Sequence, residues 1–442
     1  MEGKNNMKQK VNIFWFRRDL RLDDNNGLYK ALNSLNKVLP IFIFDTEILK
    51  QFTDIYDKRV NFIFQTLEDL NVKLKRDYKS NIQYFYGKPI DIFKLLNETY
   101  IIDSIFFNLD YEPYAIKRDK EIEEYFNGKN IKVFSFRDSF IFHKEDILKS
   151  DNKPYTVYTP YSKIWIERFN NINLEYYASE EYLHNLLPKE DNNFKIEHIG
   201  YKACGDIFHT YQIDEDIIIN YENTRDKPYL ENGVSRVGVE LRFGRISIRK
   251  LAKIANKLSL TYLKELIWRE FFMQILYHFP YVENSCFKPK YNRIRWDNNE
   301  ELFEIWCQGK TGYSIVDAGM RELSSTGFMH NRVRMITASF LTKHLLIDWR
   351  WGELYFTNKL MDYELSSNNG NWQWVAGCGC DAAPYFRIFN PTTQQEKFDP
   401  NFQYIRKWVE EFGTKDYPKP IIDHSFARNR TLSRFKKDLQ DE

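Results

Sequence analysis

The sequence predicts a chain of two domains, an α/β domain built on a doubly wound parallel sheet and an all-α domain that follows it. Strand-like and helical stretches alternate up to about residue 138, whereas beyond residue 200 the apolar residues follow a helical period and strand signals are scarce. The length of 442 residues also exceeds one ordinary core. We therefore expect an α/β domain at 1–138, a connector at 139–199 and an all-α domain at 200–442.

The α/β prediction rests on five short runs rich in β-branched and aromatic residues. We expect strands at 11–16, 38–45, 82–87, 104–109 and 132–136, and helices between them near 26–36, 57–76, 89–98 and 114–127. This alternation implies right-handed crossovers between parallel strands. The turn after the first strand reads RRDLRLDDN and lacks a GxGxxG dinucleotide fingerprint. Taken alone, this turn is a solvated ion-pair loop.

The connector and the second domain are predicted from a change in the spacing of apolar residues along the chain. Residues 139–199 are polar, contain proline and follow no period, and their length predicts some short helix. The all-α prediction rests on amphipathic stretches at 247–258, 261–278, 299–308, 314–324, 332–346, 350–362 and 401–412. Eight of the ten tryptophans lie in this second part. Most tryptophans serve packing, so packing is the first interpretation of each one.

The composition of the chain indicates the cellular compartment in which we expect it. Five cysteines, odd in number and mostly scattered, suit a reducing compartment. Cys378 and Cys380 lie two residues apart without a second Cys or His pair, so we expect no metal site there. The start of the chain has no apolar stretch of signal-peptide length, and no stretch approaches about 18 uninterrupted apolar residues. We expect a soluble, cytoplasmic monomer that does not bind membranes.

Charge is distributed unevenly along the chain. The net charge is +2, yet residues 241–350 hold 18 Lys and Arg against 10 Asp and Glu. A basic segment in a nearly neutral protein favours a polyanion bound on one face. Ordinary solvated surface remains the alternative.

Five motifs carry a resemblance that covers nearly the whole chain. They are IFWFRRDLRLDDN near the start and, later, MHNRVRMITASFL, IDWRWGELYF, NNGNWQW and DAAPYFRIFNPTTQ. In this order and spacing they resemble the photolyase and cryptochrome family, most closely the class I cyclobutane pyrimidine dimer photolyases. The resemblance implies FAD as cofactor, a second antenna chromophore, ultraviolet-damaged DNA as partner, and light-driven splitting of the dimer by an electron from reduced FAD.

Two other functions stay open beside repair. One is a cryptochrome-type blue-light photoreceptor, and the other is a flavoprotein of unrelated chemistry. Signalling members of the family often carry long C-terminal extensions, whereas this chain ends about 50 residues after FRIFNPTTQ, so we favour repair.

The resemblance assigns flavin-contacting residues in three segments. Residues 221–247 match the part that wraps the flavin diphosphate, and a turn leading into a helix N-terminus offers N–H groups to phosphate, although alone it is only a helix cap. Val234 and Gly238 stand where the family generally has Thr and Ser, so two hydroxyl contacts are missing. Asp362 is expected to pair with Arg334 and to accept hydrogen bonds from the isoalloxazine, Asn368 to face flavin N5, and Glu364 stands where Asp is usual. The full set is Tyr221, Val234, Ser235, Arg236, Val237, Gly238, Tyr262, Glu265, Arg269, Arg334, Asp362, Tyr363, Glu364 and Asn368.

The resemblance also assigns the substrate side. Trp268, Asn331, Arg332, Met335 and Trp374 are expected to contact DNA, with Glu265 on the damaged bases. The alternatives are an i,i+4 surface pair of Glu265 with Arg269, and core packing for Met335 and Trp374. Repair of (6-4) photoproducts is associated in the family with a histidine pair that supplies a proton. This chain has the single His330 there, followed by Asn and Arg, so we expect cyclobutane dimers as substrate.

Trp296, Trp349 and Trp372 match the electron-transfer triad of the family, with separations of 53 and 23 residues. We interpret Trp351 as packing or a side branch of the relay. NLDYEPYAIKRD at 108–119 resembles the version in members with a deazaflavin or flavin antenna more than the folate version. A helix start with Pro113 in its first turn explains that stretch equally well.

Overall fold

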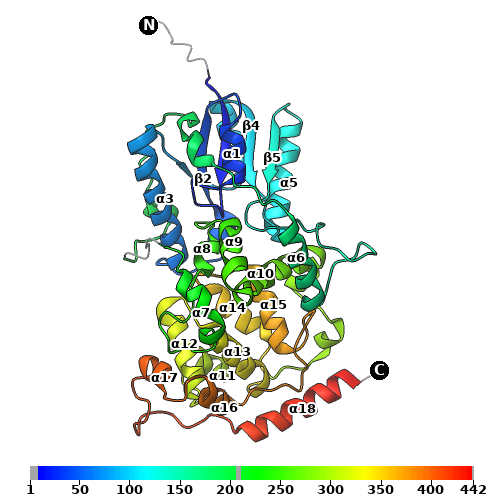
Figure 1. Cartoon of the computed structure of the whole chain (residues 1–442). Coiled ribbons are helices and arrows are strands. Elements are labelled where there is room, and N and C mark those ends of the chain that lie inside the picture. Colours follow the sequence, from blue (N-terminus) through cyan, green and yellow to red (C-terminus); the bar gives the residue numbers. More distant parts are fainter. Residues whose placement is uncertain (1–7, 206–210, 441–442) are drawn as a thin grey trace. The chain divides into compact units, whose positions relative to one another are not determined.

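The computed structural model describes residues 8–205 and 211–440. Its strands are β1 (Lys10–Phe16), β2 (Val38–Asp45), β3 (Gln83–Gly87), β4 (Ile101–Asn108) and β5 (Lys132–Phe136). They form one parallel sheet in the order β3-β2-β1-β4-β5 (Figure 1). The chain moves outward from β1 to one edge and then returns to the other side, which confirms the predicted doubly wound sheet. β2 is buried along its whole length and β1 beyond its first residue, as expected of central strands covered on both faces.

The crossovers of this sheet are helical, as predicted. They are α1 (Asn26–Leu32), α2 (Thr46–Leu49), α3 (Lys58–Tyr78), α4 (Pro89–Thr99) and α5 (Pro113–Asn127). Local chemistry fixes where they begin. The Asp57 carboxylate caps α3 by accepting from the N–H groups of Arg59 and Val60, and proline opens both α4 and α5. The stretch 108–119 therefore contains the helix start that its proline predicts.

The RRDLRLDDN turn is not a solvated loop, so that expectation is wrong. Arg21 is 4% exposed and donates to Asp138 at 2.7 Å. Arg249 donates to both Asp138 (2.9 Å) and Asp24 (3.0 Å). Buried charges persist only when they are paired, and these carboxylates and guanidiniums pair across segments that are distant in sequence.

The described residues fall into two compact units, each made of several segments. One comprises Met1–His143, Asn171–Gln212 and Val237–Lys253, and the other Lys144–Asn170, Ile213–Arg236 and Ile254–Glu442. Residues from the predicted connector, 139–199, occur in both units. The domain boundaries that we predict from sequence stay a prediction.

Helices build the second part of the chain. They are α6 (Tyr158–Asn171), α7 (Glu215–Thr224), α8 (Gly238–Arg242), α9 (Ile248–Leu258), α10 (Leu260–His278), α11 (Glu300–Cys307), α12 (Ser314–Thr326), α13 (Asn331–Ser339), α14 (Trp349–Lys359), α15 (Leu365–Ala376), α16 (Pro391–Phe398), α17 (Gln403–Trp408) and α18 (His424–Gln440). α6 confirms a helix in the connector. Among the described residues, no helix is both long and apolar enough to span a membrane.

Two of the predicted helices differ from those observed. The stretch 332–346 is α-helical only to Ser339 and continues as a π-helical turn, Phe340–His344, in which Leu345 N–H donates to Phe340 O five residues earlier. The stretch 401–412 shortens to α17, because Phe402 before it is left-handed and Val409 after it is extended. Both differences arise from backbone conformation, which the spacing of apolar residues in the sequence does not reveal.

Candidate active site

The frame of the site is the close packing of α10 against α15, which lie side by side in Figure 1. α10 begins at a cap in which the Ser259 hydroxyl accepts from Tyr262 N–H. Gly370 of α15 sets the distance between the two helices, because a Cβ there would lie 2.1 Å from Cδ1 of Phe272. Only glycine permits this approach, which brings the polar residues of α15 against α10.

Arg334 and Asp362 form the predicted ion pair. The Arg334 guanidinium donates to one Asp362 oxygen at 2.8 Å and, through Nε, to Met329 O at 2.7 Å. The other Asp362 oxygen, Oδ1, is buried and has no hydrogen-bond partner among the described residues. A buried carboxylate oxygen without a hydrogen bond costs free energy. We therefore expect a bound group to donate a hydrogen bond to this atom.

A second ion pair joins α10 to the start of α15. Arg269 donates to Glu364 at 2.9 Å, and Glu364 is buried. Glu364 also accepts from the Ser367 hydroxyl at 3.3 Å. The longer side chain that stands in place of the usual Asp is thus held on two sides.

Asn368 projects from the same turn of α15 and is also buried. Its NH₂ group donates to Glu353 O at 3.1 Å and to the Thr357 hydroxyl at 3.3 Å. Both contacts use the nitrogen, so the amide oxygen has no partner in the described part of the chain. Together with Asp362 Oδ1 it gives two unpaired acceptors, and the isoalloxazine ring of FAD presents N–H groups that such acceptors bind. The residues present therefore fit a flavin.

Only some of the residues expected to bind the flavin diphosphate lie close together in the structure. Ser235 Oγ lies 2.8 Å from Tyr262 OH, and the Tyr221 ring packs edge-on against Tyr262 at 5.0 Å. Burial raises the pKa of Tyr262 to about 12. Arg236 takes a left-handed conformation with its guanidinium over the Phe328 ring, and Val234 beside it is half-buried. Val237 and Gly238 lie in the other compact unit, where Gly238 begins α8.

A dipeptide that we did not anticipate, Arg225-Asp226, holds two expected substrate residues. Arg225 donates to Glu265 at 2.6 Å, and Asp226 accepts from Arg332 at 2.7 Å. Burial raises the pKa of Glu265, and the charge on Arg225 opposes that rise. Glu265 and Arg269 thus each have a partner on another segment. The adjacent opposite charges after α7 were the only sequence signal for this link.

Aromatic rings flank this polar group. The Trp268 indole is stacked by Tyr158, with ring centroids 3.6 Å apart, and by Phe272 at 5.4 Å. Trp268 thus stacks on rings of the protein itself and keeps part of its surface exposed. Trp374 is half-buried, with the Arg387 guanidinium 6.0 Å from its ring, and Tyr363 packs on the same hydrophobic core.

The N-terminus of α13 presents the remaining substrate candidates. Asn331 is exposed, and Arg332 lies 3.6 Å from the half-buried sulfur of Met335. His330 caps the helix, its Nδ1 accepting from Arg332 N–H at 3.2 Å. Burial lowers the pKa of His330 to about 4, so the ring is neutral at pH 7, and its buried Nε2 has no partner among the described residues.

The three predicted relay tryptophans belong to one hydrophobic core. Trp372 and Trp349 are 2% and 0% exposed, whereas Trp296 is half-buried and packs against that core. The set thus runs from the interior to the surface. Trp306, which we did not single out, lies 6.4 Å from Trp372 in an edge-on arrangement. Trp351 packs edge-on against Phe303 at 5.2 Å, which supports the packing interpretation.

Comparison with known proteins gives matches over nearly the whole chain. Residues 12–180 match a family model described as DNA photolyase, and residues 262–414 one described as the FAD binding domain of DNA photolyase. A deoxyribodipyrimidine photo-lyase of Buchnera aphidicola is 35% identical, with 96% of this chain and 98% of that protein aligned.

Two solved structures are similar over their full length. The class III photolyase of Agrobacterium tumefaciens aligns with a TM-score of 0.86 and 30% identity, covering 99% of each chain. The photolyase of Sulfolobus tokodaii, solved with two FAD molecules, aligns with a TM-score of 0.82 and 32% identity, covering 97% of this chain and 100% of that one. Because one of these is a class III structure, the resemblance to class I stays a prediction.

Proposed function

The chain belongs to the photolyase and cryptochrome family, and from that premise we propose that it repairs ultraviolet-damaged DNA by splitting cyclobutane pyrimidine dimers in blue light. The observation that carries the proposal is the pairing of Arg334 with Asp362 beside a buried carboxylate oxygen that lacks a partner among the described residues. When bound and reduced, FAD supplies the photoexcited electron that opens the cyclobutane ring and then takes it back.

Residues of α13, of the turn before α15 and of α15 itself would hold and orient this cofactor. Asp362 would accept a hydrogen bond from the flavin through its unpaired oxygen, while Arg334 fixes the other oxygen. Asn368, whose NH₂ group is anchored by Glu353 and Thr357, would offer its amide oxygen to the flavin. Ser235, Arg236 and Tyr262 serve the diphosphate, where phosphate favours hydroxyl and guanidinium donors.

The substrate side is built for pyrimidines that are flipped out of the duplex. Glu265, which Arg225 holds in place at 2.6 Å, is the residue that we assign to the damaged bases. Asn331 and Arg332 supply donors, and Met335 a polarisable apolar wall. A damaged, poorly stacked pair lowers the cost of extrusion.

His330 argues for cyclobutane dimers over (6-4) photoproducts. Proton transfer to the lesion needs a group that gains and loses its proton near neutrality. His330 is neutral there, and its Nδ1 serves as a helix cap. We therefore expect dimer splitting with negligible (6-4) repair.

Reduction of the cofactor runs through Trp372, Trp349 and Trp296, the first two buried and the last half-buried toward the surface. The second chromophore is bound by the α/β unit and is of deazaflavin, flavin or folate type. We place the protein in the cytoplasm, a reducing compartment that the scattered cysteines support, and we expect a monomer.

A direct assay tests the repair proposal. Chemically reduced protein is incubated under blue light with oligonucleotides that carry either a cyclobutane dimer or a (6-4) photoproduct, with dark samples as control. We expect loss of the dimer alone, and only in light. A dimer that persists would refute repair and favour the photoreceptor alternative, while (6-4) loss would refute the assignment of the substrate.

A further inference from the structure

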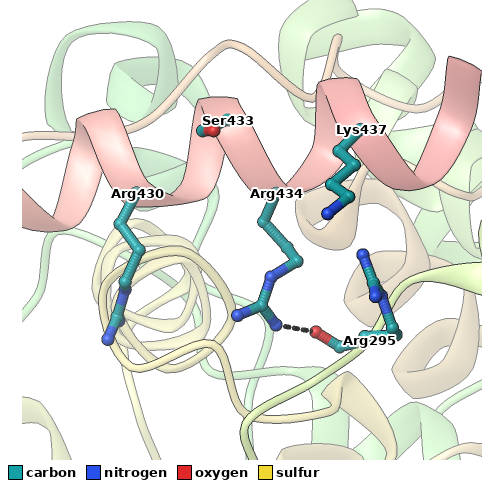
Figure 2. Close-up of a pocket in the computed structure, with 5 residues that line it drawn as sticks. All are labelled: Arg295, Arg430, Ser433, Arg434 and Lys437. Carbon is teal, nitrogen blue, oxygen red and sulfur yellow. Dashed lines mark hydrogen bonds between the residues drawn. The ribbon is translucent and has the colours of Figure 1, made fainter.

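A hollow of about 450 Å³ lies against the C-terminal helix α18, apart from every residue assigned above to flavin or lesion. It is lined by Arg295, Arg430, Ser433, Arg434 and Lys437 (Figure 2). Four of these five residues are cationic, and no acidic side chain lines the hollow in the described part of the chain.

The spacing in α18 creates this cluster. Arg430, Arg434 and Lys437 stand at i, i+4 and i+7, so they share one helix face. At 1.5 Å of rise per residue they extend over roughly 10 Å of the helix. Figure 2 shows all three directed to the same side of α18, with Arg295 facing them from the segment that precedes α11. The three cations of α18 thus form a row, and Arg295, from another segment, joins them in lining one space.

The carboxylates nearby compensate only part of this charge. Asp297 accepts from Arg434 at 2.9 Å and lies 3.6 Å from Arg430, and the buried Asp438 pairs with Arg295. Within residues 8–205 and 211–440, four cations thus face two carboxylates. Lys437 has no ion-pair partner among the described residues, and Arg430 Nε is buried without a hydrogen bond there.

Burial and like charge both act against the protonated form of Arg430. Burial lowers the pKa of Arg430, the charge on Asp297 opposes that shift, and the neighbouring charge on Arg434 adds to it. Like charges held this closely repel each other unless an anion lies between them. Guanidinium groups match phosphate in geometry and the lysine adds a point charge, so phosphate oxygens are the natural counterpart.

We propose that this hollow binds the diphosphate or triphosphate group of a small molecule, either inorganic pyrophosphate or a nucleotide. Four cations that line one hollow favour a compact polyanion over an extended nucleic-acid backbone.

Isothermal titration of the FAD-loaded protein with sodium pyrophosphate tests the proposal, because loaded flavin keeps the probe out of the cofactor's own diphosphate site. We expect one saturable site whose affinity falls as salt rises. Lys437→Gln should weaken binding about tenfold, the value of one charge-assisted contact. Lys436→Gln is the matched control, because Lys436 is its exposed neighbour and does not line the hollow.

Further probes separate the sources of the anion. ATP that binds as tightly as pyrophosphate, with the same loss in Lys437→Gln, identifies a nucleotide site, whereas ATP that binds far more weakly leaves pyrophosphate as the ligand. Arg434→Gln, checked for folding by circular dichroism, should weaken both probes. Lys437→Gln should repair dimers as well as the native protein does. A failure of the phosphate-site proposal can therefore be told apart from a failure of the repair proposal.

Three results would overturn the proposal. One is the absence of saturable binding to the native protein. Another is an equal loss in the Lys436 and Lys437 variants, which would mean a diffuse cationic surface. The third is a loss of affinity for undamaged duplex DNA in Lys437→Gln as large as its loss for pyrophosphate, which would assign the hollow to the DNA backbone.

Discussion

Replacing Glu353 by Gln should raise stability at alkaline pH and leave it unchanged at acid pH. Glu353 lies on α14, and its carboxylate accepts from the Asn369 NH₂ at 3.0 Å. Burial raises its pKa from the ordinary 4.5 to about 7. The glutamine of the variant keeps the same length and the same acceptor, so the change removes the charge and little else.

The sign follows from proton binding. Between pH 4.5 and about 7 the folded protein binds the Glu353 proton more tightly than the unfolded chain, so stability is lost as pH rises through this window. A shift of about 2.5 units at 1.36 kcal/mol each corresponds to roughly 3 kcal/mol. Glu353 is partly exposed, and solvent screening reduces the figure to roughly 2 kcal/mol.

Thermal unfolding at pH 5 and pH 8, followed by circular dichroism, measures the effect. We expect Glu353→Gln to unfold within a degree or two of the native protein at pH 5 and about 4 °C higher at pH 8. Glu304→Gln is the control, because Glu304 is exposed on α11. An offset of the Glu353 variant that is the same at both pH values would refute the argument from burial.

The remaining predictions concern the relay, the helix contact beside it and DNA. Trp372→Phe should slow photoreduction of oxidised flavin, followed by absorbance, while chemically reduced protein still repairs dimers; unchanged photoreduction would rule out the relay. Gly352→Ala should destabilise the protein by about 1–3 kcal/mol, since the new Cβ would lie 2.1 Å from Trp372 Cη2 and 2.6 Å from Leu341; unaltered thermal unfolding would contradict this packing. Affinity for damaged DNA, measured by fluorescence anisotropy, should fall as salt rises; a salt-independent affinity would count against a basic DNA face.

The fold was largely predictable because its signals are local. The alternation of strand and helix predicted the sheet, and Pro113 placed the start of α5. Helix α15 was missed because the run SSNNGNWQW reads as a polar loop. In the structure Asn368 and Asn369 are buried and hydrogen-bonded, so this helix buries amides where a period-based prediction looks for apolar side chains.

One pairing in the candidate site was predictable, whereas two others were not. The pairing of Arg334 with Asp362 followed from the resemblance, whereas the turn after α7 carries no apolar period and no motif that links it to α10 or α13. The fold nevertheless brings Arg225 to Glu265 and the adjacent Asp226 to Arg332. Two neighbouring residues of opposite charge thereby orient one acidic and one basic substrate residue together. Because both pairs depend on one short turn, the acid and the base are positioned as a unit, and under the proposed function a lesion would meet two side chains that are already held in place.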